Sequence, residues 1–168
     1  MTATVIIPTT GSIDLRTAIE SVLLQTYETK CYVVVDGKEN YGKAKVITDD
    51  YGDKVDVARL PINVGANGFY GHRVYAAFTH LINTDFVLYL DQDNWLEPNH
   101  VQSCVDTIIK NDVYWSYSLR NIYSDVGQFL LKDDCESLGK YKTFQGGHHV
   151  DTNCYCLQTK IAIQLAQA

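Results

Sequence analysis

Short apolar runs alternate along this chain with stretches whose apolar residues recur at helical spacing, and this alternation limits the fold more than any other feature. The runs at 5–7, 31–35 and 86–90 are apolar at every position. Strands of this kind are typical of sheets that are buried on both faces. Helical stretches between such strands favour parallel pairing. The sequence therefore predicts an α/β fold with a mainly parallel central sheet flanked by helices.

The same periodicity predicts the positions of the elements. Strands are expected at 5–7, 31–35, 55–60 and 86–90, with weaker ones near 113–122, 127–131 and 151–157. Helices are expected at 13–26, 41–51, 68–82, 98–110 and 159–166. In the helix at 68–82, Val74, Ala77, Phe78 and Leu81 would share one face. There is no linker or internal repeat, and 168 residues suit one domain, so residues 1–168 are expected to form a single unit.

Charge and hydropathy exclude several classes of protein. The chain has 14 Lys and Arg against 20 Asp and Glu, a net charge of −6, and no basic cluster of the kind that binds nucleic acid. No apolar run approaches the roughly 18–20 residues of a membrane span. The first residues do not resemble a signal peptide. We therefore expect a cytoplasmic protein without a membrane span or a nucleic-acid partner, and a homo-oligomer stays open.

Small and polar residues gather directly after the first four predicted strands. In sheets of this kind, ligands bind outside the carboxyl ends of the strands. The residues at these positions are Pro8, Thr9 and Thr10, then Asp36, then Asn63 and Gly65, then Asp91, Gln92 and Asp93. One edge of the sheet is thus the predicted binding site.

Asp91 and Asp93 are the most informative pair at that edge. Two carboxylates that follow a buried strand are held on a rigid support and can face one point. Mg²⁺ and Mn²⁺ prefer oxygen ligands, and one or two carboxylates with phosphate oxygens form a typical Mg²⁺ site. The pair predicts a Mn²⁺ or Mg²⁺ site or a nucleotide-sugar site. A solvated loop or a helix cap is the alternative.

A glycine-rich loop at 63–71 precedes the predicted helix. Glycines such as Gly68 let the backbone approach a ligand, and a helix N-terminus favours anions. Arg73 would oppose the helix dipole in the first turn unless an anion lies nearby, which indicates phosphate contact. For Asp36, a hydrogen bond to a base or ribose and an ordinary Asp-Gly turn are equally compatible with the sequence.

Two further groups of residues leave alternatives open. His148, His149 and Asp151 follow two glycines and could supply a metal ligand or a general base, or form a polar loop. Aromatic residues gather at 114–123, where packing on a sheet is the first interpretation and stacking on sugars or bases the second.

Taken together in order, these elements resemble the opening of a family 2 glycosyltransferase with the GT-A fold. The resemblance rests on TVIIPT at 4–9, the helix with its Gln25-Thr26-Tyr27 end, the strand before Asp36-Gly37, the Asn63-Val64-Gly65 element and FVLYLDQDNWLEPNHV at 86–101. It covers about the first 110 residues.

The resemblance implies transfer of a sugar from a nucleotide-diphosphate sugar, commonly a UDP-sugar, to a glycan, lipid or protein acceptor. It places Pro8 and Thr9 at the nucleoside, Asp36 at the base and Arg73 near the base or phosphates. Asp91 would contact the ribose or sugar, and Asp93 would bind the metal. The family commonly carries its general base in a late Glu-Asp pair, which this chain lacks, so Asp151 is the best substitute, ahead of Asp133, Asp134 and Glu136.

The main hypothesis is therefore a metal-dependent, inverting glycosyltransferase. A non-catalytic nucleotide-sugar-binding module without a competent base is the first alternative. A nucleotidyltransferase would need a basic glycine-rich loop near the N-terminus, and the loop at 9–12 has no basic residue. A phosphatase with Asp91 as nucleophile would leave the resemblance at 4–37 unexplained.

Overall fold

The computed structural model describes residues 1–133 and 150–167, and its centre is a six-stranded sheet in the order β3-β2-β1-β4-β8-β5. The strands are β1 (Ala3–Thr9), β2 (Thr29–Val35), β3 (Val55–Arg59), β4 (Phe86–Tyr89), β5 (Trp115–Tyr117) and β8 (Tyr155–Gln158). Strands β1 to β4 pair in parallel, whereas β8 runs antiparallel to both β4 and β5. The predicted α/β fold with a mainly parallel sheet is confirmed.

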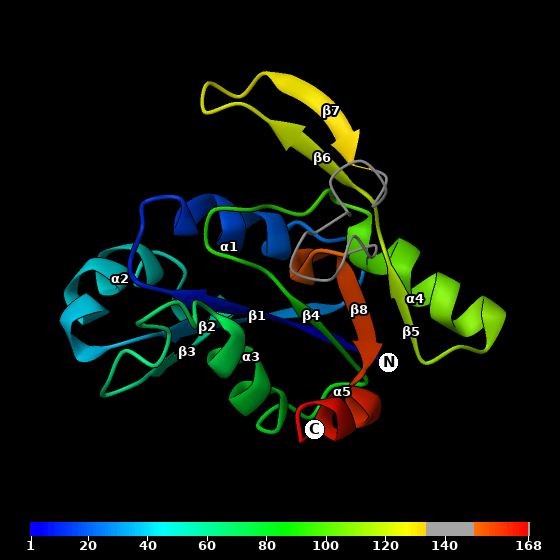
Figure 1. Cartoon of the computed structure of the whole chain (residues 1–168), viewed down its shortest axis with the longest axis horizontal. Coiled ribbons are helices and arrows are strands. Elements are labelled where there is room, and N and C mark those ends of the chain that lie inside the picture. Colours follow the sequence, from blue (N-terminus) through cyan, green and yellow to red (C-terminus); the bar gives the residue numbers. More distant parts are fainter. Residues whose placement is uncertain (134–149, 168) are drawn as a thin grey trace.

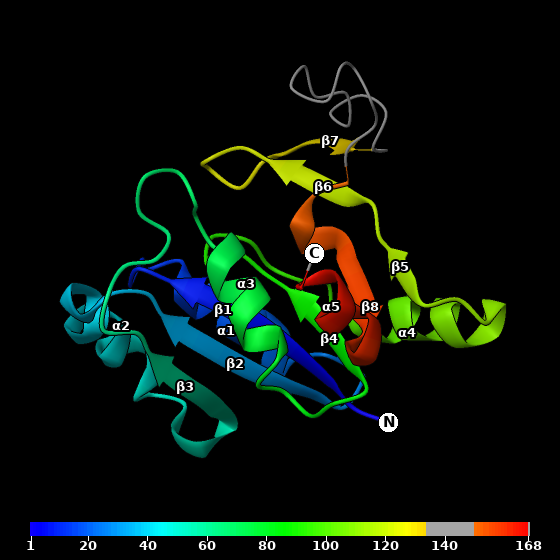
Figure 2. The same ribbon diagram turned by 60° about the horizontal axis from the view of Figure 1, so that its bottom comes forward.

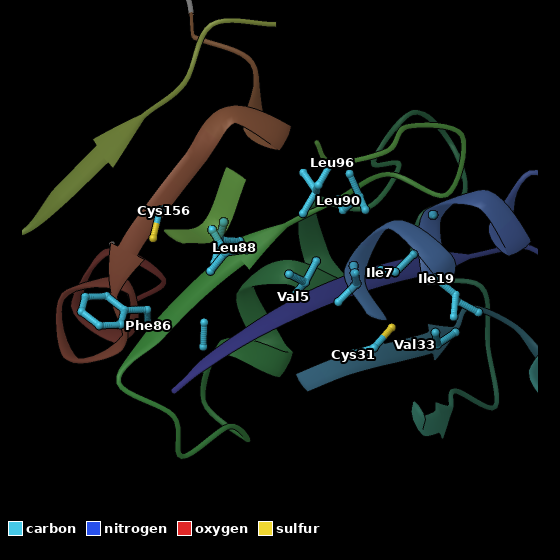
Figure 3. Packing of buried hydrophobic residues seen from close by; sticks show 14 of the residues in the cluster. Val5, Ile7, Ile19, Cys31, Val33, Phe86, Leu88, Leu90, Leu96 and Cys156 are labelled. Carbon is cyan, nitrogen blue, oxygen red and sulfur yellow. The ribbon is translucent and has the colours of Figure 1, made fainter. Parts of the chain in front are cut away.

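Helices cover both faces of this sheet (Figure 1). The helices are α1 (Leu15–Leu23), α2 (Tyr41–Thr48), α3 (His72–Thr79), α4 (His100–Asn111) and α5 (Thr159–Leu165). Successive strand residues point to opposite faces. Val5 and Leu88 therefore pack with α1, α2 and α4 (Figure 3), while Ile6 and Val87 pack with α3 and α5. All four of these side chains are completely buried, which explains why the central strands are apolar at every position.

A two-stranded hairpin, β6 (Arg120–Tyr123) and β7 (Phe129–Asp133), stands outside the main sheet (Figures 1 and 2). The prediction of a single strand at 113–122 was wrong, because this stretch contains β5 of the main sheet and most of β6 of the hairpin. The break follows β5, where the Ser118 N–H donates to the Cys154 carbonyl oxygen at 3.0 Å. The hairpin leaves the main sheet after this contact.

Helix α3 is shorter than the expected helix at 68–82. Gly68 has a φ of +85°, a left-handed conformation that cannot continue a right-handed helix, so the preceding loop extends to residue 71. Val74 and Phe78 are buried as predicted, but Ala77 and Leu81 are exposed. Leu81 lies beyond the end of the helix, which explains why the predicted apolar face stops early.

The chain order reverses between β1 and β4, which are neighbours in the sheet although two strands separate them in sequence. Such a switch point leaves a crevice at the carboxyl ends of the two strands. The strand expected at 151–157 begins only at Tyr155, and a 3₁₀ turn, η4 (Thr152–Cys154), precedes it. Because β8 is antiparallel to β4, this turn lies at the same crevice. Within the described residues, no helix is both long and apolar enough to cross a membrane.

Candidate active site

A cavity of about 730 Å³ opens at the carboxyl ends of β1, β2 and β4. It collects side chains from six separate parts of the chain. Its wall is formed by Pro8, Thr9, Thr10, Asp36, Asn63, Gly65, Ala66, Tyr70, Gly71, His72, Tyr75, Asp91, Gln92, Asp93, Asp151 and Thr152. Most of the site residues expected from sequence are thus brought together in one place. We call this space the first cavity.

Asp36 holds the glycine-rich loop against the end of β2. Its two carboxylate oxygens accept hydrogen bonds from the backbone N–H groups of Val64, at 2.7 Å, and Gly65, at 2.8 Å. The contact leaves no room for a side chain on the loop, because a Cβ at Gly65 would lie 2.2 Å from the Tyr70 carbonyl oxygen. Asp36 therefore shapes the wall of the first cavity by fixing this loop.

Replacing Asp36 with asparagine is expected to lower the free energy of unfolding by about 1–3 kcal/mol. The asparagine amide has only one oxygen, so its NH₂ group would face one of the two backbone donors in a buried position. Urea denaturation followed by circular dichroism measures the change. Asp56→Asn is the matched control, because Asp56 is exposed on β3, and it should change stability by less than about 0.5 kcal/mol. Equal stability of Asp36→Asn and Asp56→Asn would contradict this role of Asp36.

Gln92 connects the ends of β4 and β1. Its side-chain oxygen accepts hydrogen bonds from the Thr9 hydroxyl at 2.7 Å and from the Thr10 backbone N–H at 3.1 Å. The Thr9 hydroxyl in turn accepts from the Gly11 N–H at 2.9 Å. These contacts fix the loop that follows β1, so Pro8, Thr9 and Thr10 form one rigid wall of the first cavity.

Asp91 is held in place from two sides. The Tyr75 hydroxyl donates to its Oδ1 at 2.6 Å, and the Asn153 side-chain amide donates to its Oδ2 at 2.9 Å. Burial and the negative charge of Asp91 raise the pKa of Tyr75, so the phenol stays protonated and keeps donating. The Asp91 backbone N–H also donates to Asn153 Oδ1, at 2.5 Å. Asp91 is therefore a carboxylate whose position is set before any ligand binds.

Asp93 differs from Asp91 because it is exposed, and no hydrogen bond to its carboxylate is found in the part of the chain that the structure describes. Its oxygens are therefore available to a ligand. The described wall of the first cavity carries four carboxylates, those of Asp36, Asp91, Asp93 and Asp151, and no lysine or arginine. A hard divalent cation fits this set, with Asp93 as the open ligand and Asp91 beside it. No group of three or more His, Cys, Asp or Glu side chains suited to a metal occurs among the described residues. Within them, Asp93 and Asp91 are the candidate ligands.

Asp151 is the fourth carboxylate, and it forms an ion pair with Arg120 of β6 at 2.5 Å. Arg120 also contacts Asp133 at 2.9 Å. Asp151 Oδ1 accepts from both the backbone and the side-chain N–H groups of Asn153, at 2.9 and 2.6 Å. Burial acts to raise the pKa of Asp151, but these hydrogen bonds and the charge of Arg120 outweigh it and lower the pKa. Asp151 is consequently ionised at neutral pH.

Two of the predicted site residues are not found in this wall, and two more lie outside the described residues. Gly68 and Arg73 lie outside the first cavity. The guanidinium of Arg73 stacks on the Phe69 ring at 3.3 Å and donates to the Val64 carbonyl oxygen at 3.4 Å. The expected position of Arg73 near the base or the phosphates stays a prediction. His148 and His149 lie outside the described residues.

Tyr75 and Asn153 are the main contributions that the sequence analysis missed. Both contact Asp91, yet they lie 16 and 62 residues away from it along the chain. Tyr75 is next to the predicted apolar face of its helix, and a phenol in that position is a signal that could have been followed. Nothing in the local pattern around Asn153 indicates its role, because the contact depends on the antiparallel course of β8.

The comparisons with known proteins agree with this geometry. The model of the family described as glycosyl transferase family 2 matches residues 4–164. The chain belongs to glycosyl transferase family 2. A curated relative, the glucosyl-dolichyl phosphate glucuronosyltransferase of Haloferax volcanii, is 37% identical over 94 residues, which are 55% of this chain and 28% of that protein. The present chain thus spans under a third of that relative.

Solved structures of S. aureus TarS share the fold of this family 2 chain. The structure of TarS residues 1–349 has a TM-score of 0.72 at 15% identity and covers 98% of this chain and 49% of that one. TarS 1–349 in complex with UDP-GlcNAc has a TM-score of 0.71 at 15% identity, over 98% and 47% of the two chains. At this identity the likeness shows the fold, and the predicted GT-A fold is confirmed.

Proposed function

We propose that this family 2 chain transfers a sugar from a UDP-sugar to an acceptor hydroxyl, with a divalent cation at Asp93 and Asp91. The observation that carries the proposal is the first cavity at the β1–β4 switch point, where donor-site residues from four strand ends converge. Membership of family 2 supports glycosyl transfer, and the complex of TarS with UDP-GlcNAc supports a uridine donor. The activity, the donor and the cation remain proposals for this chain.

The charge of the first cavity supports dependence on a metal. A nucleotide diphosphate is an anion, and it would meet four carboxylates without a lysine or arginine in the described wall. Like charges at such distances repel, so binding of the diphosphate needs a compensating cation. When bound, Mn²⁺ or Mg²⁺ would neutralise the charge that develops on the diphosphate leaving group. Asp93 would contact the ion directly, while Tyr75 and Asn153 keep Asp91 in position beside it.

Asp151 is the proposed general base. Its carboxylate lies in the same wall as Asp91 and Asp93 and is ionised, so it can accept the proton of an acceptor hydroxyl as the new glycosidic bond forms. Attack by that hydroxyl on the face opposite the leaving group inverts the anomeric carbon. Arg120 and Asn153 orient the carboxylate toward the cavity and keep it charged.

Calorimetric titration with UDP, GDP and CDP, each with and without Mn²⁺, tests the donor and cation proposals. We expect UDP alone among the three to bind tightly, and only when Mn²⁺ is present. Tight binding of UDP without metal would contradict the cation requirement. A preference for GDP or CDP would overturn the uridine assignment, and no binding of any nucleotide would overturn the proposed function.

A non-catalytic nucleotide-sugar-binding module is the second candidate. The observation that favours it is the ion pair of Asp151 with Arg120, because a lowered pKa makes this carboxylate a weaker base. The module would bind UDP and Mn²⁺ but release no UDP from UDP-sugars. The two candidates are separated by measuring free UDP with water as the acceptor. The glycosyltransferase should hydrolyse the UDP-sugar slowly, and the module should not.

A further inference from the structure

A second cavity, of about 150 Å³, lies beside the first cavity. Its wall comes from the loop after β4, the start of α4, the segment from Ser118 to Tyr123, and the residues around η4. Asp151 belongs to both cavities, so the proposed base faces the two spaces at once. At roughly 30 Å³ per liquid water molecule, the space corresponds to about five waters. That is room for about one sugar ring inside the cavity.

Trp95 gives the second cavity an aromatic wall. The neighbouring Leu96 is buried and anchors the loop, because its backbone N–H donates to the Ser21 hydroxyl at 3.1 Å (Figure 3 shows Leu96 in the core). Trp95 is left 44% exposed, and its ring packs against that of Tyr123, with 5.1 Å between the ring centroids, so the two rings form one aromatic surface. Tyr123 in turn contacts the Phe129 ring of the hairpin at 5.7 Å, so Trp95 lies at the cavity end of an aromatic cluster that is separate from the core and from the first cavity. An aromatic face at the edge of a polar cavity suits the apolar C–H face of a sugar ring.

The charges of the second cavity favour a neutral ligand. Arg120 is its one cation among the described residues, and its guanidinium is engaged by Asp133 and Asp151. Glu97 and Asp151 contribute negative charge to the same wall. Burial lowers the pKa of His100 to about 4, so this side chain is neutral at pH 7. Within the described part of the chain, an anionic sugar would therefore meet negative charge without a free cation.

We infer that the second cavity holds the acceptor as a single neutral pyranose ring, stacked on Trp95 and Tyr123 with one hydroxyl toward Asp151. This inference rests on the proposed function, which supplies the donor sugar on the other side of Asp151. The arrangement would bring the acceptor hydroxyl, the base and the donor to one boundary between the two cavities. It also names the acceptor class that the sequence left open, namely a neutral sugar at the end of a glycan or glycoside.

The test uses the two tryptophans of the chain, Trp95 and Trp115, as reporters. Their indole N–H signals are recorded by NMR in the full chain with UDP and Mn²⁺ and are assigned with Trp115→Phe. The probes are methyl glucoside, methyl galactoside and methyl N-acetylglucosaminide as neutral rings, and methyl glucuronide as the anionic ring. We expect one neutral ring to shift the Trp95 signal saturably, to leave Trp115 unmoved and to bind at least about tenfold more tightly than the glucuronide.

Trp95→Ala and Trp115→Ala form a matched pair, because the two indoles are 44% and 46% exposed. Affinity for the neutral ring, followed on the backbone amide of Asn121 in the second cavity, should fall about tenfold in Trp95→Ala and stay unchanged in Trp115→Ala. Unchanged UDP affinity in Trp95→Ala shows that the variant is folded and that the first cavity is intact.

Three outcomes overturn the inference. The first is a Trp95 signal that does not move with any neutral probe up to about 50 mM, a concentration range that reveals millimolar dissociation constants. The second is an equal affinity for the neutral ring and the glucuronide. The third is an equal loss of affinity in both alanine variants. If UDP binds and no sugar does, the inference fails while the proposed function stands. If UDP does not bind either, the proposed function fails as well.

Discussion

Asp93→Asn is expected to abolish the Mn²⁺ dependence of UDP binding and to lower turnover by about 10²–10³-fold, the range seen when one charge-stabilising group is lost. Asp93 is the exposed carboxylate of the first cavity and has no hydrogen bond within the described part of the chain. An asparagine retains the size and one oxygen but removes the charge that attracts the cation. Calorimetry with UDP and Mn²⁺, together with steady-state release of UDP, measures both effects.

Asp125→Asn is the control for this substitution, because Asp125 is exposed in the turn of the β6–β7 hairpin and lines neither cavity. It should bind UDP and Mn²⁺ like the unmodified chain. Since the exposed Asp93 side chain has no hydrogen bond to any described residue, both variants should also unfold at the same urea concentration. Metal-dependent UDP binding that survives in Asp93→Asn would remove Asp93 from the cation site.

Asp151→Asn is expected to lower turnover by about 10²–10⁴-fold, the usual contribution of a general base, while UDP and Mn²⁺ bind with nearly unchanged affinity. The asparagine can still accept the hydrogen bonds of Asn153, but it cannot take a proton from the acceptor. The measurement is turnover under saturating UDP-sugar, paired with calorimetry of the same preparation. A fall in UDP affinity as large as the fall in turnover would indicate a structural role instead.

Asp133→Asn tests whether Asp151 acts as the general base or only holds Arg120 in position. Asp133 is the other partner of Arg120, at 2.9 Å, but it lines neither cavity. If Asp151 acts only by holding Arg120, the two variants should lose turnover to a similar extent. If Asp151 is the base, Asp133→Asn should keep most of its turnover even where it loses stability.

The pH dependence of turnover follows from the lowered pKa of Asp151. The rate should fall on the acid side only at a pH below the ordinary aspartate value of about 3.9, as far as folding permits. Arg120→Met removes a charge that lowers this pKa, so the acid limb should move to higher pH. The free energy of unfolding should also fall as the pH is lowered. The depressed pKa contributes stability above the unfolded-state pKa, and this contribution is lost as the pH falls through the folded-state pKa.

The sequence by itself determined the central sheet and the edge of it that carries the site. Apolar strands separated by helices pair in parallel, and parallel strands bring their carboxyl ends to one edge. Pro8, Asp36 and the Asp91–Asp93 pair could therefore be placed in one cavity without any contact being known. Pro8 lies near the end of β1, and the aspartates follow the ends of β2 and β4, so their positions depend on short-range order.

The tertiary structure alone decided which groups hold these carboxylates. Asn153 reaches Asp91 across 62 residues because β8 runs antiparallel to β4, so the beginning of β8, and not its end, meets the crevice. Arg120 reaches Asp151 because the chain leaves the main sheet after β5. Gly68 was assigned to the helix, yet it has a left-handed φ, α3 begins only at His72, and Arg73 stacks on Phe69. Local periodicity carries no information on strand direction or long-range contacts, and these decided how the first cavity is completed and where the second one forms.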